Sequence, residues 1–161
     1  MKVAVIMGSR SDLPVAEKTL QTLSSFGIEY EVRVISAHRA LDMLQDYVAS
    51  FAERNIQVVI ALAGKAAHLP GVIAGMTTLP VIGVPIKGSA FGGLDSLMSI
   101  VQMPSGVPVA TVAVDGAENA AILACQMLAL ASPELRAKLE AHKLTLEEGV
   151  QEQDRQVRSA E

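Results

Sequence analysis

The side chains best suited to chemistry lie in three short loops near the start of the chain. Gly8–Asp12 carries two hydroxyls, an arginine and a carboxylate, Ser36–Arg39 carries a hydroxyl, an imidazole and a guanidinium, and Gly64–Gly71 carries a lysine and a second imidazole. An imidazole can move a proton near neutral pH, and a guanidinium can hold a phosphate or carboxylate through two hydrogen bonds. Together these groups predict acid–base chemistry on a small anionic molecule.

The first loop, Gly8–Asp12, has the features of a phosphate-binding site. Backbone N–H groups at the start of a helix attract anions, and the hydroxyls of Ser9 and Ser11 add donors. The alternative is that Ser11 or Asp12 only caps the following helix. Asp12 could also form an acid–base pair with Asp95. The chain has no Walker loop, because its one Gly-Lys pair is followed by alanine, and it has no G-x-G-x-x-G pattern.

The histidines fit acid–base catalysis better than metal binding. His38 directly precedes Arg39, and His68 lies among small and apolar residues, where it could orient His38 or donate to a backbone carbonyl. His142 falls in a polar segment and is expected to be solvated. The three histidines lack metal-ligand spacing and no cysteine joins them, so no metal site is predicted.

Each of the three loops directly follows an apolar run that predicts a strand. These runs are Val3–Met7, Val32–Ile35 and Val58–Ala63. A helical pattern follows each loop, so the strands should be parallel and their carboxyl ends should share one edge of a sheet. Open α/β sheets bind ligands at that edge. Two further strands are predicted at Val81–Val84 and Val109–Val114.

Apolar residues at helical spacing fill most of the remaining chain. The predicted helices are Leu13 to about Gly27, Leu41 to about Asn55, a short one after Pro70, Asp95 to about Gln102, and Ala117–Ala131. Ser132 and Pro133 are a typical cap and first residue of a last helix. This last segment is polar and is expected to fray after about Gln151. We therefore expect an α/β catalytic domain at 1–131 and, at 132–161, a helical arm that packs on neighbouring subunits.

Composition excludes several classes of protein. The 161 residues are 50% hydrophobic but only 3% aromatic, with no Trp, as expected for aliphatic parallel strands under small-residue helices. A net charge of −4 without a basic run argues against nucleic acid and anionic membranes as partners. The first strand leaves no room for a signal peptide, and no apolar run is long enough for a membrane span. The single cysteine, Cys125, is expected to be a buried small hydrophobe, which suits a reducing cytoplasm.

Four motifs, in the same order, resemble those of the PurE family in its bacterial class I form. They are Gly8-Ser9-Arg10-Ser11-Asp12, Ser36-Ala37-His38-Arg39, Ala66-Ala67-His68-Leu69-Pro70-Gly71, and the segment from Asp95 to Pro108 that contains Ser-Ile-Val-Gln-Met-Pro. The resemblance runs from about Lys2 to Ala131. The His-Leu-Pro-Gly and Ser-Ile-Val-Gln-Met-Pro stretches are highly specific.

The resemblance implies a three-layer α/β sandwich with a central parallel sheet, flavodoxin-like or Rossmann-like, assembled as a cytoplasmic homo-octamer. It implies 5-(carboxyamino)imidazole ribonucleotide mutase activity in purine biosynthesis, with His38 as the general acid–base. Ser9 and Arg39 would hold the phosphate side of the ribonucleotide, with Asp12 binding the substrate and Ser11 and Ser36 nearby. The rest of the implied substrate site is the loop residues Gly64, Lys65, Ala66, Ala67, His68 and Leu69.

The implied reaction moves a carboxylate from an exocyclic nitrogen to ring C4. Carbon dioxide is released as a trapped intermediate in a closed pocket, C4 recaptures it, and His38 removes the C4 proton. Such a reaction needs no cofactor and no metal, and it suits a tight pocket that works by effective concentration.

The chain also departs from the family pattern. Lys65 replaces a glycine, Ala40-Leu41 a Thr-Pro pair, and Phe91-Gly92 a leucine and a small polar residue, while Asp115–Asn119 is shorter than usual. The nearest alternative is the class II carboxylase, which uses free carbon dioxide. The Ala66–Gly71 loop argues for the mutase instead, because the class II enzymes resemble a serine-asparagine version of this loop. A remoter alternative is a flavodoxin-like FMN-binding module, which would need more aromatic residues near the ligand.

Overall fold

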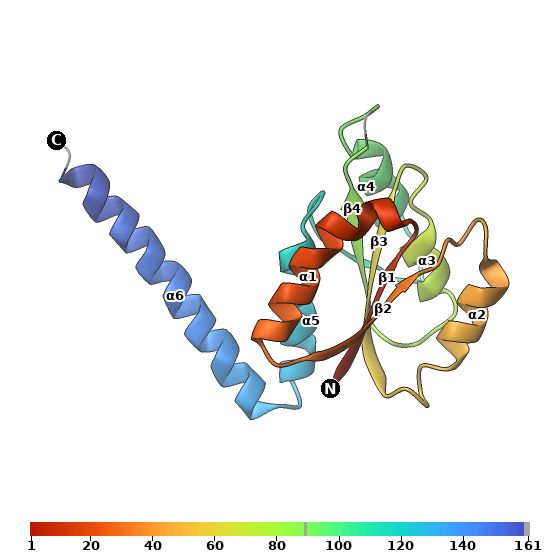
Figure 1. Cartoon of the computed structure of the whole chain (residues 1–161), viewed down its shortest axis with the longest axis horizontal. Coiled ribbons are helices and arrows are strands. Elements are labelled where there is room, and N and C mark those ends of the chain that lie inside the picture. The colour runs from red at the N-terminus through yellow and green to blue at the C-terminus, as the bar shows by residue number, and fades with distance from the viewer. Residues whose placement is uncertain (89, 160–161) are drawn as a thin grey trace.

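A five-stranded parallel sheet with strand order β2-β1-β3-β4-β5 forms the centre of the fold (Figure 1). The computed structural model describes residues 1–88 and 90–159. The strands are β1 Lys2–Met7, β2 Glu29–Val34, β3 Ile56–Gly64, β4 Val81–Ile86 and β5 Ala110–Thr111. Val3–Met7 are wholly buried, which is why this run is continuously apolar rather than alternating.

Helices cover both faces of the sheet, which makes three layers. α1 (Leu13–Ser25) and α5 (Ala117–Ala129) pack on one face, in a core that includes Val5 and Cys125. α2 (Leu41–Ala49), α3 (Leu69–Ala74) and α4 (Leu94–Val101) pack on the other face, in a core that includes Ile6. The predicted α/β fold class is confirmed. Cys125 is buried as expected, and burial raises the pKa of its thiol to about 11.

The fifth strand is much shorter than the predicted Val109–Val114. It pairs with β4 only at Ala110 and Thr111, and two single bonds follow, from Val112 N to the Gly83 carbonyl and from Asp115 N to the Pro85 carbonyl. The backbone carbonyls of residues 83 and 85 both point toward β5. Any other residue at position 85 would also donate its backbone N–H to β5, and proline has none, so one bond of the ladder is missing there.

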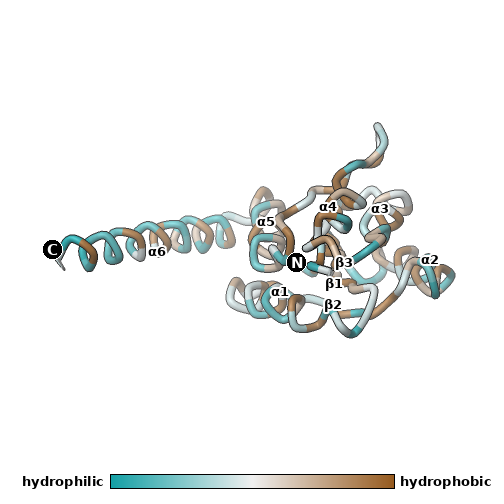
Figure 2. Tube along the Cα trace, turned by 90° about the horizontal axis from the view of Figure 1, so that it is seen from above, coloured by the Kyte–Doolittle hydropathy of each residue, from teal (hydrophilic) through white to brown (hydrophobic). Residues whose placement is uncertain are grey.

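The last helix, α6 (Pro133–Arg158), leaves the body beside α5 as a long rod (Figure 2). The Ser132 side chain accepts a hydrogen bond from Leu135 N at 3.3 Å, as predicted for its cap. The expectation of fraying after Gln151 is wrong. The helix continues to Arg158, and its last turns carry ion pairs between Glu152 and Arg155 and between Asp154 and Arg158.

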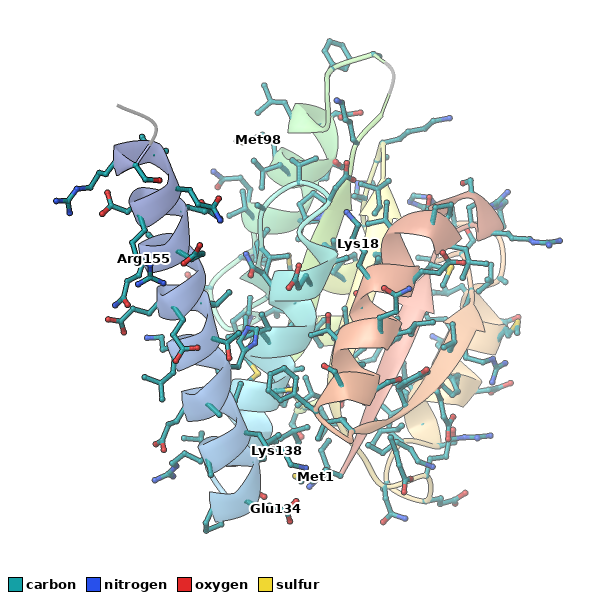
Figure 3. All side chains as sticks on the ribbon, turned by 60° about the vertical axis from the view of Figure 1, so that its left-hand side comes forward. Met1, Lys18, Met98, Glu134, Lys138 and Arg155 are labelled. Atoms are coloured by element: carbon teal, nitrogen blue, oxygen red, sulfur yellow. The ribbon has the colours of Figure 1, made fainter. Side chains whose placement is uncertain are left out.

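The first turns of α6 belong to the core of the α/β domain, contrary to expectation. Leu135 is only 2% exposed, and Lys138 donates to the Phe26 carbonyl at 3.5 Å from the side of α6 that faces the body (Figure 3). The prediction that His142 is solvated is also wrong, because its ring packs edge-on against Phe26 with centroids 5.5 Å apart and its Nε2 is buried. Beyond it the apolar side chains are exposed, at Leu144, Leu146, Val150 and Val157. In the described part of the chain, no helix is long and apolar enough to cross a membrane.

Tyr47 on α2 fixes the element that follows the second loop to the edge strand β2. Its ring is buried, its hydroxyl donates to Glu31 Oε2 at 3.1 Å, and the Arg33 guanidinium lies 4.6 Å from the ring centroid. This attachment holds α2 at a fixed distance from β2, and so restrains the Ser36–Arg39 loop that joins them.

Tyr47→Phe should remove a stability loss that the native protein suffers at alkaline pH. Burial, reinforced by the charge on Glu31, raises the pKa of Tyr47 to about 12, whereas an unfolded tyrosine ionises near pH 10. The resulting stabilisation is complete below pH 10 and is lost as the pH rises from 10 to 12. Urea unfolding of both proteins between pH 8 and 12 measures it. If the free energies of unfolding of the two proteins differ by a constant amount from pH 8 to pH 12, the assignment is contradicted. At pH 8 the variant should be less stable by about 1 kcal/mol, the usual value of one hydrogen bond.

Candidate active site

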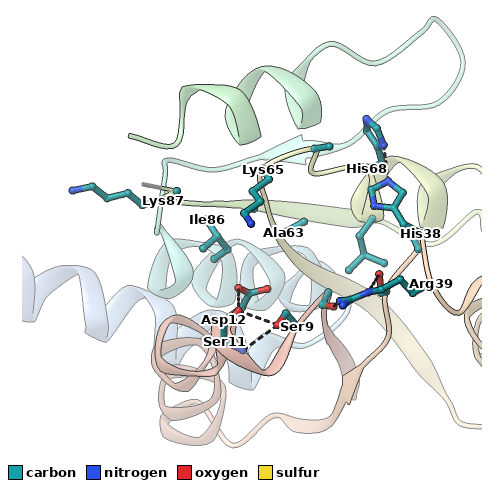
Figure 4. Close-up of a pocket in the computed structure, with 17 residues that line it drawn as sticks. Ser9, Ser11, Asp12, His38, Arg39, Ala63, Lys65, His68, Ile86 and Lys87 are labelled. Atoms are coloured by element: carbon teal, nitrogen blue, oxygen red, sulfur yellow. Dashed lines mark hydrogen bonds between the residues drawn. The ribbon is translucent and has the colours of Figure 1, made fainter. Parts of the chain in front are cut away.

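A cavity of about 570 Å³ opens at the carboxyl ends of β1, β3 and β4, where the three loops meet (Figure 4). The parallel strands bring the loops together from positions far apart in the sequence, as expected from the topology. The residues that line the cavity are Gly8, Ser9, Ser11, Asp12, Ser36, Ala37, His38, Arg39, Ala63, Gly64, Lys65, Ala66, His68, Leu69, Ile86, Lys87 and Gly88.

The structure brings together every residue of the expected site except Ala67. That residue is only 1% exposed and packs in the core beneath α2 and α3, so its expected place in the lining is wrong. Asp95 also lies outside the cavity lining, and its Oδ1 is buried away from any hydrogen-bond partner in the described residues. The suggested acid–base pair of Asp12 and Asp95 is therefore not found in this cavity.

The first loop is shaped by its own hydroxyl groups. A short 3₁₀ turn, η1 (Arg10–Asp12), precedes α1, and the Ser9 side chain caps it by accepting from Ser11 N at 3.3 Å. The Ser11 hydroxyl lies 2.9 Å from Ser9 Oγ and 3.2 Å from Asp12 Oδ1. Ser9 therefore caps this 3₁₀ turn, whereas Asp12 occupies the N-cap position of α1 without a capping hydrogen bond from its side chain.

Asp12 is a largely buried carboxylate on the floor of the cavity. It is 9% exposed, and burial raises its pKa despite opposing hydrogen bonds from the Ser11 hydroxyl and the Ser9 backbone. A carboxylate held in this way can accept hydrogen bonds from the hydroxyl groups of a ligand.

Arg39 joins the first and second loops. Its Nη2 donates to the Gly8 carbonyl at 3.2 Å, and its Nε donates to Ser36 Oγ at 3.2 Å. A guanidinium has five N–H groups, so these two bonds orient it and leave donors for a ligand. Its position beside the Ser9 loop suits an anion.

His38 and His68 form a directly coupled pair. His38 Nε2 and His68 Nδ1 lie 2.8 Å apart, with the two rings nearly perpendicular at 87°. A bond between two ring nitrogens requires that one carries the proton and the other accepts it, so each ring fixes the tautomer and orientation of the other. Of the two roles suggested for His68, this geometry supports the orientation of His38.

Sequence reasoning missed the contribution of β4. Its last residue Ile86 and the following Lys87 and Gly88 line the cavity. Ala63, Gly8 and Ala37 line it as well, from strands and loops that were already expected at the site. The signal was available, because β4 was predicted and its carboxyl end must lie at the same edge of a parallel sheet as those of β1 and β3.

Comparison with known proteins identifies the family of this chain. Residues 2–149 match the protein family described as AIR carboxylase. The chain belongs to the AIR carboxylase family. It is 56% identical over 142 residues to the N5-carboxyaminoimidazole ribonucleotide mutase of Pyrococcus abyssi, covering 88% of this chain and 82% of that protein. It is 50% identical over 145 residues to the enzyme of the same name from Vibrio cholerae, covering 89% and 90%.

Other relatives in the AIR carboxylase family differ in length or in sequence. The chain is 51% identical over 145 residues to the chloroplastic phosphoribosylaminoimidazole carboxylase of Vigna aconitifolia, covering 90% of this chain but 26% of that protein. The crystal structure of Treponema denticola PurE superposes with a TM-score of 0.89 at 29% identity, covering 96% and 97% of the two chains. The resemblance to PurE is thus confirmed in sequence and in fold.

Proposed function

We propose that this protein is an isomerase of purine biosynthesis that converts N5-carboxyaminoimidazole ribonucleotide into the C4 carboxylate. The observation that carries the proposal is the cavity itself, which combines a hydroxyl-rich loop, an arginine and a coupled histidine pair in a chain at least 50% identical to mutases along most of its length. Two further relatives of the same name, from Pyrococcus horikoshii and Thermotoga maritima, are each 54% identical to this chain.

We assign the roles of the cavity residues from their positions. Arg39 and Ser9, with Ser11 and Ser36 beside them, receive the phosphate, since they supply charge and N–H or O–H donors on adjoining loops. Asp12 accepts from the ribose hydroxyls. The other wall of the pocket is the loop after β3, from Gly64 to Leu69, excluding the buried Ala67.

His38 provides the proton transfers. Cleavage of the N–carboxylate bond gives carbon dioxide and requires one proton at the nitrogen. Attack of C4 on carbon dioxide forms the new C–C bond, and loss of the C4 proton restores the aromatic ring. One proton is delivered and one is removed, so a single imidazole returns to its starting state. His68 orients this imidazole through the 2.8 Å contact, with the two rings at 87° to each other.

A turnover assay with two substrate sets tests the proposal. The mutase should convert the N5-carboxylated ribonucleotide without added bicarbonate. The second candidate, a carboxylase, is favoured by the name of the Vigna relative and would use aminoimidazole ribonucleotide plus bicarbonate. Efficient use of the second set alone would overturn the mutase assignment in favour of the carboxylase.

We also propose that the subunits assemble as a homo-oligomer, an octamer as the family resemblance implies, through the distal half of α6. The exposed apolar residues Leu144, Leu146 and Val150 lie beyond the part of α6 that packs on its own domain. On α4, Leu94, Met98 and Val101 form a second exposed apolar stripe. Burial of such surfaces against another subunit would be favourable.

Truncation after Lys143 should leave the domain folded but reduce the size of the assembly. The shortened helix keeps Leu135 and the His142–Phe26 contact, so its own core is intact, whereas the exposed apolar residues of the distal half are removed. Light scattering gives the mass, and circular dichroism checks the fold. The double variant Leu146→Lys, Val150→Lys keeps the helix and should act in the same direction. An unchanged mass for both proteins would refute this role of α6.

A further inference from the structure

Lys65 adopts a backbone conformation that its residue type does not favour. It follows the end of β3 with φ of +57°, in the left-handed region. Among the described residues two other non-glycine positions share this conformation, Asn55 and Asp115, and both are types that tolerate it. Lysine has no such tolerance. Backbone strain at a cavity wall is found where the surroundings hold a residue in place for a function.

The side chain of Lys65 lines the cavity and is exposed to solvent there. Figure 4 shows its amine directed into the cavity, on the side of Asp12, whereas Lys87 extends away from it. None of the ion pairs in the described part of the chain includes Lys65. Its ammonium is therefore available to a ligand.

The charges of the cavity divide between two places. Arg39 is tied to the first two loops through Gly8 and Ser36, on the side assigned to the phosphate. Lys65 stands on a different loop, three positions before His68, whose ring contacts His38. Lys65 is thus a second cation whose side chain is directed into the cavity, and a ligand with two anionic groups can meet Arg39 at one of them and Lys65 at the other (Figure 4).

The proposed substrate and product each carry a second anionic group at their reacting end. The one carboxylate among the cavity-lining residues, Asp12, would repel it, and a nearby ammonium offsets that repulsion. Because the ammonium of lysine lies at the end of a flexible four-carbon stem, it can follow a carboxylate that moves only from the exocyclic nitrogen to the neighbouring ring carbon.

We propose that Lys65 binds the migrating carboxylate and thereby makes the site selective for carboxylated over uncarboxylated aminoimidazole ribonucleotide. This inference rests on the proposed function. Arg39 serves the phosphate, which both ligands share, and Lys65 serves the group that distinguishes them.

Calorimetric titration of three variants with two ligands tests this assignment. Lys65→Gly removes the charge and relaxes the backbone, and Lys65→Asn removes the charge with a residue that tolerates a positive φ, so both should fold. Lys143→Asn removes one exposed lysine from α6, far from the cavity, as the control. The ligands are the C4-carboxylated product and aminoimidazole ribonucleotide, which bear the same phosphate.

Both Lys65 variants should bind the carboxylated product roughly 10- to 100-fold more weakly, as expected for a lost charge-assisted hydrogen bond, and should bind aminoimidazole ribonucleotide as the native protein does. The control should match the native protein with both ligands. Unchanged affinity for the product in both Lys65 variants would overturn the inference, as would an equal loss for the two ligands, which would place Lys65 at the phosphate.

The same titration separates this inference from the proposed function. A native protein that binds both ligands and turns over the mutase substrate, with Lys65 variants that behave identically, refutes the role of Lys65 alone. A native protein that binds neither ligand refutes the proposed function together with the inference.

Discussion

His38→Asn is expected to reduce turnover by at least ~100-fold while leaving a folded protein that still binds the ribonucleotide. A positioned acid–base group contributes about 10²–10⁴ in rate, and His38 has this role in the proposed mechanism. The amide of asparagine does not reach the position of His38 Nε2, which lies 2.8 Å from His68 Nδ1, so the variant removes both the titratable ring and its bond to His68. Single-turnover kinetics with the N5-carboxylated substrate measure the effect.

A matched variant and a binding measurement control this experiment. His142→Asn changes a histidine that packs against Phe26 outside the cavity and should keep the native rate. Affinity for aminoimidazole ribonucleotide should survive in His38→Asn, because the phosphate contacts are assigned to Arg39 and Ser9. A His38→Asn protein with near-normal turnover would remove His38 from the proton transfer.

The positions of the main strands along the chain, and of the loops that follow them, could be predicted from the sequence because burial on both faces of a sheet requires continuous apolar runs. Val3–Met7 and Val58–Ala63 are such runs, and the parallel topology then places the loops that follow them at one edge. Val109–Val114 is also a largely apolar run, but its pairing depends on β4, whose residues lie 28 positions earlier in the register and include Pro85, which lacks an N–H. Local patterns do not contain such long-range information.

The identity of the site residues was also largely accessible, whereas their contacts were not. A motif indicates that His38 and His68 belong to one site, but only the fold sets the contact between Nε2 and Nδ1. Ala67 shows the opposite limit, since it lies within a site motif and yet points into the core. His142 was misjudged because the polarity of a helix does not reveal which of its turns pack on Phe26.

Arg39→Ala should weaken ribonucleotide binding roughly 10- to 100-fold, with a smaller change in the turnover of bound substrate. Hydrogen bonds to charged groups contribute about 1.5–3 kcal/mol, and a phosphate contact is present in the ground state and the transition state alike. The loss should therefore be found mainly in KM and in the dissociation constant. Ser9→Ala should act in the same direction and more weakly, because it removes a neutral donor.

The structural role of Arg39 must be separated from its binding role, because its bonds to the Gly8 carbonyl and Ser36 Oγ also join two loops. Comparing the ribonucleotide with its nucleoside, which lacks the phosphate, makes this separation. A phosphate contact predicts that Arg39→Ala weakens the nucleotide alone, whereas disordered loops would weaken both ligands. Arg39→Lys keeps the charge but not the two-point geometry and should fall between the native protein and Arg39→Ala. Unchanged nucleotide affinity in Arg39→Ala and Ser9→Ala would contradict the assignment, because these loops would then not receive the phosphate.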